Sequence, residues 1–321
     1  MLIQPADLIG QYSLAEHIQF ADEYFAKLRE HVYLLQKPFY HPQNCAPSLA
    51  NLAQLLGGLR LDYGMKVLDF AAGSCWLSRI LVQMGCDATS CDVSETALDI
   101  GRELFVRYPP IADNPGKHDF LKFDGQSILA PHSHFDRIIV NDAFHHIPNP
   151  TTVLAEMYRV LRDDGIVAMS EPGRLHSRTN ESQQEMETYH VIENDFIMED
   201  IWEQARAIGF QYIEICPVLR QTYMSMEQYL ECISGKVPPH VITTLVGDTY
   251  NHSIFFLYKK DPGSSSRVPE RFTVLSQGDF DEGYYLQQYP DVANAIKNGS
   301  FANAWHHYEK HGRAEGRRGR R

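Results

Sequence analysis

The sequence predicts an α/β protein built on a doubly wound, mostly parallel sheet of seven strands, with an N-terminal helical cap and a small C-terminal helical module. Three observations lead to this fold class. Short apolar runs alternate with helical patterns between residues 61 and 260, as in a parallel sheet covered by helices on both faces. The stretch VLDFAAGSCWLS, residues 67–78, passes from a buried-strand pattern into a helix through small residues. A Pro- and Ser-containing segment, residues 261–274, reads as a linker to a last segment of different character.

Residues 1–60 are expected to form the helical cap. Apolar side chains recur at helical spacing over residues 14–35, and a proline-rich stretch at 37–47 then interrupts the pattern. A further helix is predicted to begin after Ser48, a candidate cap, and to stop at Gly57–Gly58.

The domain at 61–260 carries the predicted sheet. Its strands are expected at residues 66–70, 87–91, 119–123, 135–140, 166–171, 211–218 and 252–260. Helices are expected between them at residues 75–84, 94–107, 150–165 and 195–208. The last strand is expected to run antiparallel at an edge of the sheet. The partly polar segment 219–251 before it is expected to be a helical insertion that could line a pocket.

Residues 275–321 are expected to form the C-terminal module of two or three short helices. Pro290 is suited to the first position of one helix and Gly299 to its end, because proline lacks an N–H and glycine tolerates the turn that ends a helix. Ser300 is expected to restart a helix that ends at Gly312.

The composition is that of a globular protein, with 44% hydrophobic and 22% charged residues. A formal net charge of −12 argues against a nucleic-acid partner, which would require a basic surface. The apolar runs are too short to span a bilayer, and the N-terminus lacks the pattern of a signal peptide. Six cysteines without a C-x-x-C pair favour free thiols in a reducing compartment. We therefore expect a cytoplasmic protein without membrane insertion.

Polar and small residues follow four of the predicted strands, where an open α/β sheet binds its ligands. Asp69 and a run of small residues end the first strand, and Asp92, which could accept both hydroxyls of a ribose, ends the second. Asp124 ends the third strand and is placed to accept an exocyclic amine. The fourth strand ends in NDAFHH, residues 141–146.

This constellation resembles the class I S-adenosylmethionine-dependent methyltransferases over about residues 60–217. The stretch FHHIPNPTTVLAEMYRVLRDDGIVAMSEPG is similar to a segment of that superfamily with histidines, a proline turn, a helix ending in RVL and a strand. One departure is Ala71, which stands where the family usually has glycine. An alanine costs little there if its φ is negative and blocks the loop if its φ is positive; we expect it to be tolerated. Ser74-Cys75 replaces another small pair.

The resemblance implies a Rossmann-like methyltransferase fold, S-adenosylmethionine as cofactor, and a role for each strand end. Asp69 is implied to orient the loop and to contact the methionine amine, directly or through water. The other implied contacts are Ala71, Gly73 and Ser74 with the methionine part, Asp92 with the ribose, Val93 with the adenine, Asp124 and Gly125 with the adenine amine, and Asn141 with the methionine ammonium through its carbonyl. Taken singly, each aspartate could instead be an ordinary helix cap or turn residue. A nicotinamide cofactor fits less well, because its pyrophosphate requires a G-x-G-x-x-G loop.

Methyl transfer to a hydroxyl is helped by a base, and histidine is the commonest base near neutral pH. His145 and His146 are the candidate bases, with Asp142 a weaker candidate; the alternative is that these histidines only shape the pocket. No metal ligands are assigned, because the histidine pairs lack zinc-site spacing. A magnesium site formed by Asp142 and Glu171 for an acceptor with neighbouring hydroxyls stays open, since the sequence does not place these two residues together.

The polar segment 170–210 resembles methyltransferases found among bacterial polysaccharide proteins, and residues such as Glu171, His176 and Glu193 suit a sugar. We therefore expect O-methylation of a sugar, a glycan precursor or another small molecule. Two alternatives stay open: a non-catalytic, regulatory S-adenosylmethionine-binding module, and a methyltransferase for a small aromatic or quinone acceptor. The C-terminal module resembles a short repeat of bacterial carbohydrate-associated proteins, which implies a protein or glycan partner.

Overall fold

The computed structural model describes residues 2–28, 33–218, 225–227, 230, 251–263, 277–312, 317 and 319–320. The chain divides into two compact units, Met1–Asp261 and Pro262–Arg321, and each is described by itself. Most of the predicted insertion at 219–251 and of the predicted linker at 261–274 lies outside the described residues. No helix in the described part of the chain is long and apolar enough to cross a membrane.

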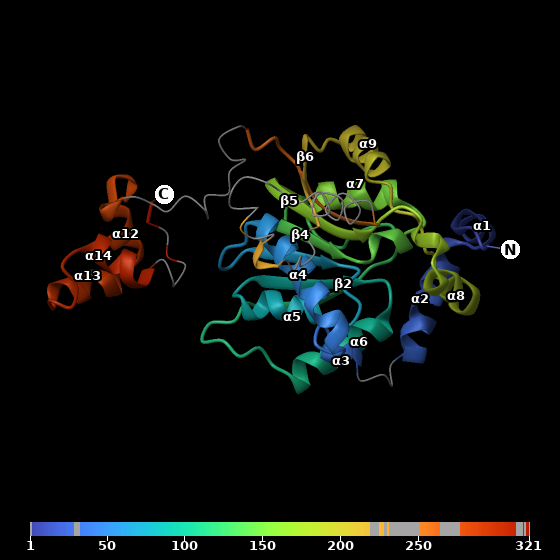
Figure 1. Cartoon of the computed structure of the whole chain (residues 1–321), viewed down its shortest axis with the longest axis horizontal. Helices are drawn as coiled ribbons and strands as arrows, with labels where there is room; N and C mark the ends of the chain where they lie inside the picture. Colours follow the sequence, from blue (N-terminus) through green and yellow to red (C-terminus); the bar gives the residue numbers. More distant parts are fainter. Residues whose placement is uncertain are drawn as a thin grey trace. The chain divides into compact units, whose positions relative to one another are not determined.

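The first unit is built on a seven-stranded sheet, which confirms the predicted fold class (Figure 1). In spatial order the strands are β3 (His118–Lys122), β2 (Asp87–Asp92), β1 (Lys66–Phe70), β4 (Phe135–Asn141), β5 (Leu161–Pro172), β7 (His252–Tyr258) and β6 (Tyr212–Cys216). The first five pair in parallel, while β7 is antiparallel to both of its neighbours.

The prediction that the last strand lies at an edge is wrong. Strand β7 is inserted between β5 and β6, and β6 forms the edge. All residues of β7 from Ser253 to Tyr258 are buried, whereas no residue of β6 is. A continuous apolar run buries both of its faces only inside a sheet, which explains why β7 takes the interior position.

Helices cover both faces of the sheet (Figure 1). One face packs on α7 (Pro150–Val160) and α9 (Met198–Ile208), and the other packs on α4 (Pro42–Leu59) and α5 (Trp76–Gln83). Side chains alternate accordingly along β5, where Val167 and Met169 join the first core and Ile166 and Ala168 join the second. Helix α6 (Glu95–Arg107) packs beside α5, and Leu98 buries its side chain against Cys75.

Helix α4 departs from the prediction at both ends. It begins at Pro42 instead of Ser48, and it runs through Gly57–Gly58 to Leu59. A Cβ at Gly58 would lie 2.0 Å from the ring of Phe256, so this glycine lets the helix approach β7 closely. Helix α4 is therefore part of the helical layer that packs on one face of the sheet, and Leu52 and Leu55 join the hydrophobic core between them.

The predicted helix 150–165 also ends early. Helix α7 stops at Val160, and Leu161 adopts an extended backbone, with ψ 137°, that starts β5. Leu161 pairs with Phe135 before a register irregularity in β4. The predicted helices 75–84 and 94–107 correspond to α5 and α6, with Ser94 accepting the N–H of Ala97 as an N-cap.

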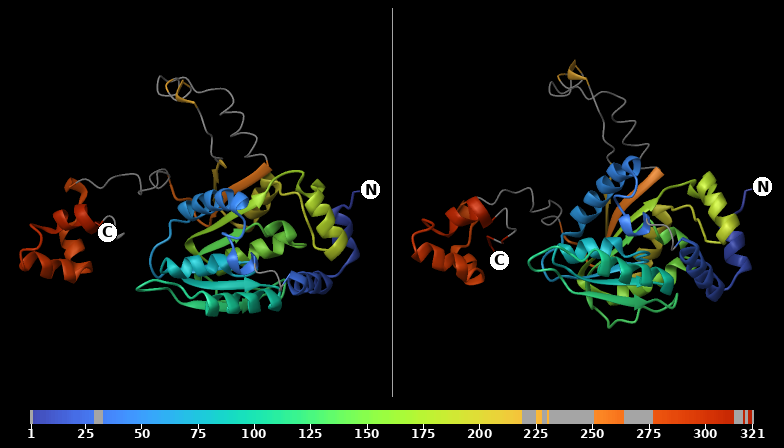
Figure 2. Two further views of the ribbon diagram at one scale, coloured as in Figure 1. Left: turned by 60° about the horizontal axis from the view of Figure 1, so that its bottom comes forward. Right: turned by 90° about the horizontal axis from the view of Figure 1, so that it is seen from below.

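The N-terminal segment forms α1 (Pro5–Gln11), α2 (Leu14–Leu28) and α3 (Tyr33–Gln36). Asp22 of α2 accepts hydrogen bonds from the Ser94 hydroxyl at 2.7 Å and from the Thr96 N–H at 3.0 Å at the start of α6. On its other side α2 packs against α8 (Asn180–Tyr189), a helix that the sequence did not predict (Figure 2). These contacts hold α2 over the carboxyl edge of the sheet.

The second unit contains α12 (Glu282–Gln288), α13 (Pro290–Lys297) and α14 (Ala304–His307), followed by a π-helical turn at Tyr308–Gly312. Pro290 occupies the first turn of α13, as predicted. The predicted restart at Ser300 is wrong: α14 begins later, where the side chain of Asn303 caps it by accepting the N–H of His306 at 2.8 Å. Tyr285, Val292 and Ala304 form a small buried core.

Candidate active site

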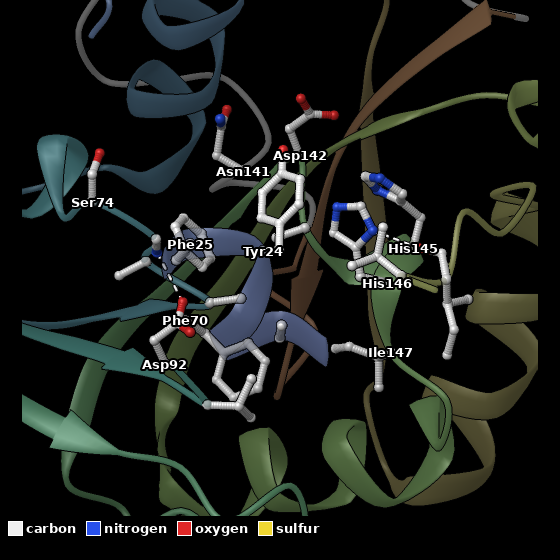
Figure 3. A pocket seen from close by; sticks show the side chains of 18 of the residues that line it. Tyr24, Phe25, Phe70, Ser74, Asp92, Asn141, Asp142, His145, His146 and Ile147 are labelled. Atoms are coloured by element: carbon white, nitrogen blue, oxygen red, sulfur yellow. Dashed lines mark hydrogen bonds between the residues drawn. The ribbon is translucent and has the colours of Figure 1, made fainter. Parts of the chain in front are cut away.

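A cavity of about 510 Å³ lies at the carboxyl ends of β1, β2 and β4, under helices α2 and α3. Most of the residues singled out from the sequence line it: Ala71, Gly73, Ser74, Asp92, Val93, Gly125, Asn141, Asp142, His145 and His146. Figure 3 shows Ser74 and Asp92 on one side, the two histidines on the other, and the ring of Tyr24 between them. The cavity therefore has two halves: a β1–β2 half at Ser74 and Asp92, and a histidine half at His145 and His146.

The loop after β1 is built on alternating left-handed residues. Ala71, Gly73 and Cys75 have φ values of +54°, +52° and +58°. Ser74 donates its hydroxyl to the carbonyl of Leu34 at 2.9 Å, which ties the loop to α3. The left-handed backbone at Ala71 is the costly alternative for an alanine, and it explains why glycine is the usual residue at this point of such loops.

We expect Ala71→Gly to raise the free energy of unfolding by up to about 1 kcal/mol. Removing the Cβ relieves a left-handed strain of about 1–2 kcal/mol, which the added freedom of the unfolded chain partly offsets. Urea denaturation would measure the change. Ala72→Gly is the matched control, because Ala72 has no positive φ, and it should lower stability by about 1 kcal/mol. An equal loss in both variants would contradict the strain at Ala71.

Asp92 holds the loop in place. Its carboxylate accepts the N–H of Gly73 and the N–H of Ser94, both at 2.8 Å. Its side chain is 5% exposed, and burial raises its pKa. A carboxylate has about four acceptor positions, so lone pairs are left over for a ligand in the cavity. The neighbouring Val93 adds an apolar wall.

Two of the predicted ligand carboxylates point elsewhere. Asp69 is buried behind the loop, where it accepts the Ser78 hydroxyl at 2.6 Å, and burial raises its pKa to about 7. Asp124 is exposed and accepts the N–H groups of Gln126 at 2.8 Å and Ser127 at 2.6 Å, as an ordinary turn residue does. Neither is among the described residues that line the cavity. Direct contacts of their carboxylates with a ligand, as the sequence suggested, therefore find no support.

Glu171 organises the segment after β4. This side chain is fully buried, and it accepts the N–H groups of Ala143 at 3.1 Å, Phe144 at 3.0 Å and His145 at 3.3 Å. It also pairs with Nδ1 of His145 at 2.8 Å. The tight turn that leads from β4 into this segment has a left-handed backbone at Asp142, with φ +55°. One carboxylate therefore fixes both the backbone and a ring of the histidine segment.

His145 and His146 are adjacent but differ in environment. Burial opposes a charge on His145, but the hydrogen bond and the charge of Glu171 outweigh it and raise the pKa of His145 to about 9. Desolvation in the cavity and the charge of His145 lower the pKa of His146. Nδ1 of His146 lies 2.6 Å from the Ile192 carbonyl and must donate to it, which leaves Nε2 as the acceptor nitrogen.

The histidine half continues into the segment after β5. Glu193 is buried, with Oε2 2.7 Å from Nε2 of His176 and 3.3 Å from the Ser182 hydroxyl. Burial and the nearby Glu193 raise the pKa of Glu185 to about 7. Lys37, which burial gives a lowered pKa, also lines the cavity. This half is rich in hydrogen-bonding groups.

The sequence predicted the N-terminal helical cap, but not which side chains of α2 face the cavity. Tyr24 and Phe25 line the cavity, and the Tyr24 hydroxyl lies 3.5 Å from Glu185. A Cβ on Gly73 would meet the Phe25 ring at 3.4 Å, so the aromatic ring closes over the loop. Helical periodicity predicted α2 but could not show that two consecutive aromatic residues face this cavity.

The sequence is similar to those of known methyltransferases. Residues 68–169 match a family model described as a methyltransferase domain. The chain is 30% identical over 131 residues to a ubiquinone biosynthesis O-methyltransferase of Glaesserella parasuis, covering 36% of this chain and 52% of that protein. It is 27% identical over 144 residues to a demethylmenaquinone methyltransferase of Streptomyces griseus, covering 45% and 54%. The chain thus spans about half the length of these curated relatives.

A solved structure shares the fold. Phosphoethanolamine N-methyltransferase 2 of Haemonchus contortus, in complex with phosphomonomethylethanolamine and S-adenosylhomocysteine, superposes with a TM-score of 0.52 at 18% identity. The match covers 77% of this chain and 59% of that one. At this identity the similarity concerns the arrangement of the sheet and its helices.

Proposed function

We propose, on the premise that this chain carries a class I S-adenosylmethionine-dependent methyltransferase domain, that it methylates a hydroxyl group of a small molecule. One observation carries the proposal. The loop after β1, Asp92 and the histidine segment after β4, which lie far apart in the sequence, line one cavity at the carboxyl edge of the parallel strands. Such an edge is where open α/β sheets bind their ligands.

The residues of the β1–β2 half fit the cofactor. The loop at Gly73 brings backbone close to the cavity, and Asp92 keeps acceptor positions for the ribose hydroxyls. Val93 and Phe25 provide an apolar surface for the adenine ring. The carbonyl of Asn141 is assigned to the ammonium group. When bound, the cofactor would supply a methyl group from its positively charged sulfur. The methyl carbon would bond to the acceptor oxygen as its bond to sulfur breaks.

We assign His146 as the group that takes the proton of the acceptor hydroxyl. Its side chain is 40% exposed where it lines the cavity, and the carbonyl of Ile192 occupies its Nδ1. Nε2 therefore carries the free lone pair that a base needs. His145 is held by Glu171 with only 4% exposure, so we assign it a supporting role. Asp142 lines the cavity and is kept as a weaker candidate.

His146→Ala is expected to lower the turnover number at least about 100-fold, the usual contribution of a positioned base. Affinity for S-adenosylhomocysteine should change less than about threefold, because His146 lies outside the half assigned to the cofactor. Methyl transfer from labelled S-adenosylmethionine and calorimetry measure the two quantities. His132→Ala, at an exposed position, is the control. A full rate in His146→Ala would assign proton removal to another group.

A hydroxyl-rich acceptor, a sugar or glycan precursor, suits the histidine half best. His176, Ser182, Glu185 and Glu193 offer several donors and acceptors in one wall. A small aromatic or quinone-type acceptor is the second candidate, because the relatives are named for ubiquinone and menaquinone biosynthesis. A catechol-like ring and a sugar share one feature, a pair of neighbouring hydroxyls.

The test combines binding with turnover. Calorimetry should show S-adenosylhomocysteine binding to the full chain, and labelled methyl transfer should then be measured with sugar nucleotides, oligosaccharides and catechols. Transfer to one class identifies the acceptor. Cofactor binding without transfer to any of them would favour the regulatory alternative, and absence of binding would contradict the proposal.

For the C-terminal unit we propose a protein or glycan partner, since its small core supports an independent module.

A further inference from the structure

Three metal-binding side chains converge in the histidine half of the cavity. His145, His176 and Glu193 each offer one ligand atom, and these atoms all lie within 4.8 Å of one another. Oε2 of Glu193 is 2.7 Å from Nε2 of His176 and 3.7 Å from Nε2 of His145. Metal bonds of about 2.0–2.2 Å would place neighbouring ligand atoms about 3 Å apart, so small side-chain rotations complete the geometry.

The first histidine has the support that metal-binding histidines show. Nδ1 of His145 pairs with the fully buried Glu171 at 2.8 Å, which directs Nε2 toward His176 and Glu193. A carboxylate behind the ligand fixes the tautomer and the ring orientation. Glu171 is itself held by three backbone N–H groups. The ligand is thus oriented before any ion arrives.

A second, independent observation concerns the carboxylate of Glu193. Glu193 is 3% exposed, and its Oε1 is buried without a hydrogen-bond partner. Nδ1 of His146 lies 3.2 Å from this oxygen, but its proton is directed to the carbonyl of Ile192 at 2.6 Å. A buried carboxylate oxygen without a donor is costly. Either a proton shared with the neighbouring Glu185 or a bound cation would satisfy the carboxylate of Glu193.

We propose that the histidine half of the cavity binds one divalent transition-metal ion through Nε2 of His145, Nε2 of His176 and the carboxylate of Glu193. Two imidazoles and one carboxylate suit ions such as Mn²⁺, Co²⁺ and Zn²⁺ and leave coordination positions open to the cavity. Sequence spacing missed this site, because the three ligands come from separate segments and match no zinc pattern.

The role of the ion rests on the proposed function. Neighbouring hydroxyls of an acceptor would take the open positions, and the metal-bound hydroxyl would lose its proton more readily. That proton would pass to Nε2 of His146. The ion would thereby select acceptors with paired hydroxyls, a feature that sugars and catechols share.

The test uses the full chain, freed of metal with a chelator and titrated with cobalt(II) chloride. Visible absorption and calorimetry should show one ion per chain, displaced by Zn²⁺. His176→Ala and Glu193→Gln should each weaken binding at least about 10-fold, and Glu171→Gln about 10–100-fold. His132→Ala, an exposed histidine elsewhere, should bind as the unchanged protein does. Thermal melting checks that each variant is folded.

The outcomes separate this proposal from the proposed function. No cobalt binding, or equal binding by the unchanged protein, His176→Ala and Glu193→Gln, would overturn the metal site. S-adenosylhomocysteine affinity is measured on the same metal-free samples. If the cofactor product binds and cobalt does not, the metal site fails alone; if cobalt binds as predicted without cofactor binding, the proposed function fails alone.

Discussion

Glu171→Ala is expected to lower the free energy of unfolding by about 3–5 kcal/mol, the range found when one partner of a buried charged pair is removed. The variant loses the acceptor for the N–H groups of Ala143, Phe144 and His145, and it leaves the ring of His145 buried without its partner. Each buried donor left unsatisfied adds to the cost. The histidine segment should loosen, and methyl transfer should fall with it.

Denaturant unfolding of the full chain, followed by circular dichroism, measures this loss. Glu187→Ala is the matched control, because Glu187 is an exposed glutamate of α8, and its change should stay within about 0.5 kcal/mol. A loss below about 1 kcal/mol in Glu171→Ala would mean that water or a rearranged loop replaces the carboxylate.

Asp92→Ala is expected to raise the dissociation constant for S-adenosylhomocysteine at least about 10-fold. The reason is twofold. The variant removes the acceptor assigned to the ribose, and it releases the N–H of Gly73, which positions the loop. Calorimetry with S-adenosylhomocysteine measures the change, and a melting curve verifies that the variant is folded.

Asp124→Ala is the informative comparison. The carboxylate of Asp124 caps an exposed turn in the structure, so this variant should change affinity less than about threefold. If Asp124→Ala weakened binding as strongly as Asp92→Ala, the adenine contact inferred from the sequence would be restored. Unchanged binding in Asp92→Ala would remove the ribose assignment.

Much of the fold could be predicted from the sequence, because its signals are local. Alternating apolar runs and helical patterns were sufficient to predict the sheet, and the small residues between β1 and α5 marked the loop at the cavity. Pro290 marked a helix start for the same reason: its missing N–H suits the first turn of α13 wherever that helix packs.

The site depended on more than strand ends. Asp69, Asp92 and Asp124 follow successive strands and look equivalent in the sequence, yet only Asp92 lines the cavity. Hydrogen bonds to Ser78 and to an exposed turn claim the other two carboxylates. Which direction a carboxylate takes depends on donors that folding brings near it.

The sequence by itself determined the alternation of strands and helices, the glycine-containing loop and the two histidines after β4. Tertiary structure alone decided that β7 lies inside the sheet, that Gly58 admits Phe256, and that Tyr24 and Phe25 of α2 line the cavity. It also decided that His145, His176 and Glu193 meet. The physical reason is that periodicity and turn chemistry act over a few residues, whereas burial, close packing and charge pairing join groups that the chain separates widely.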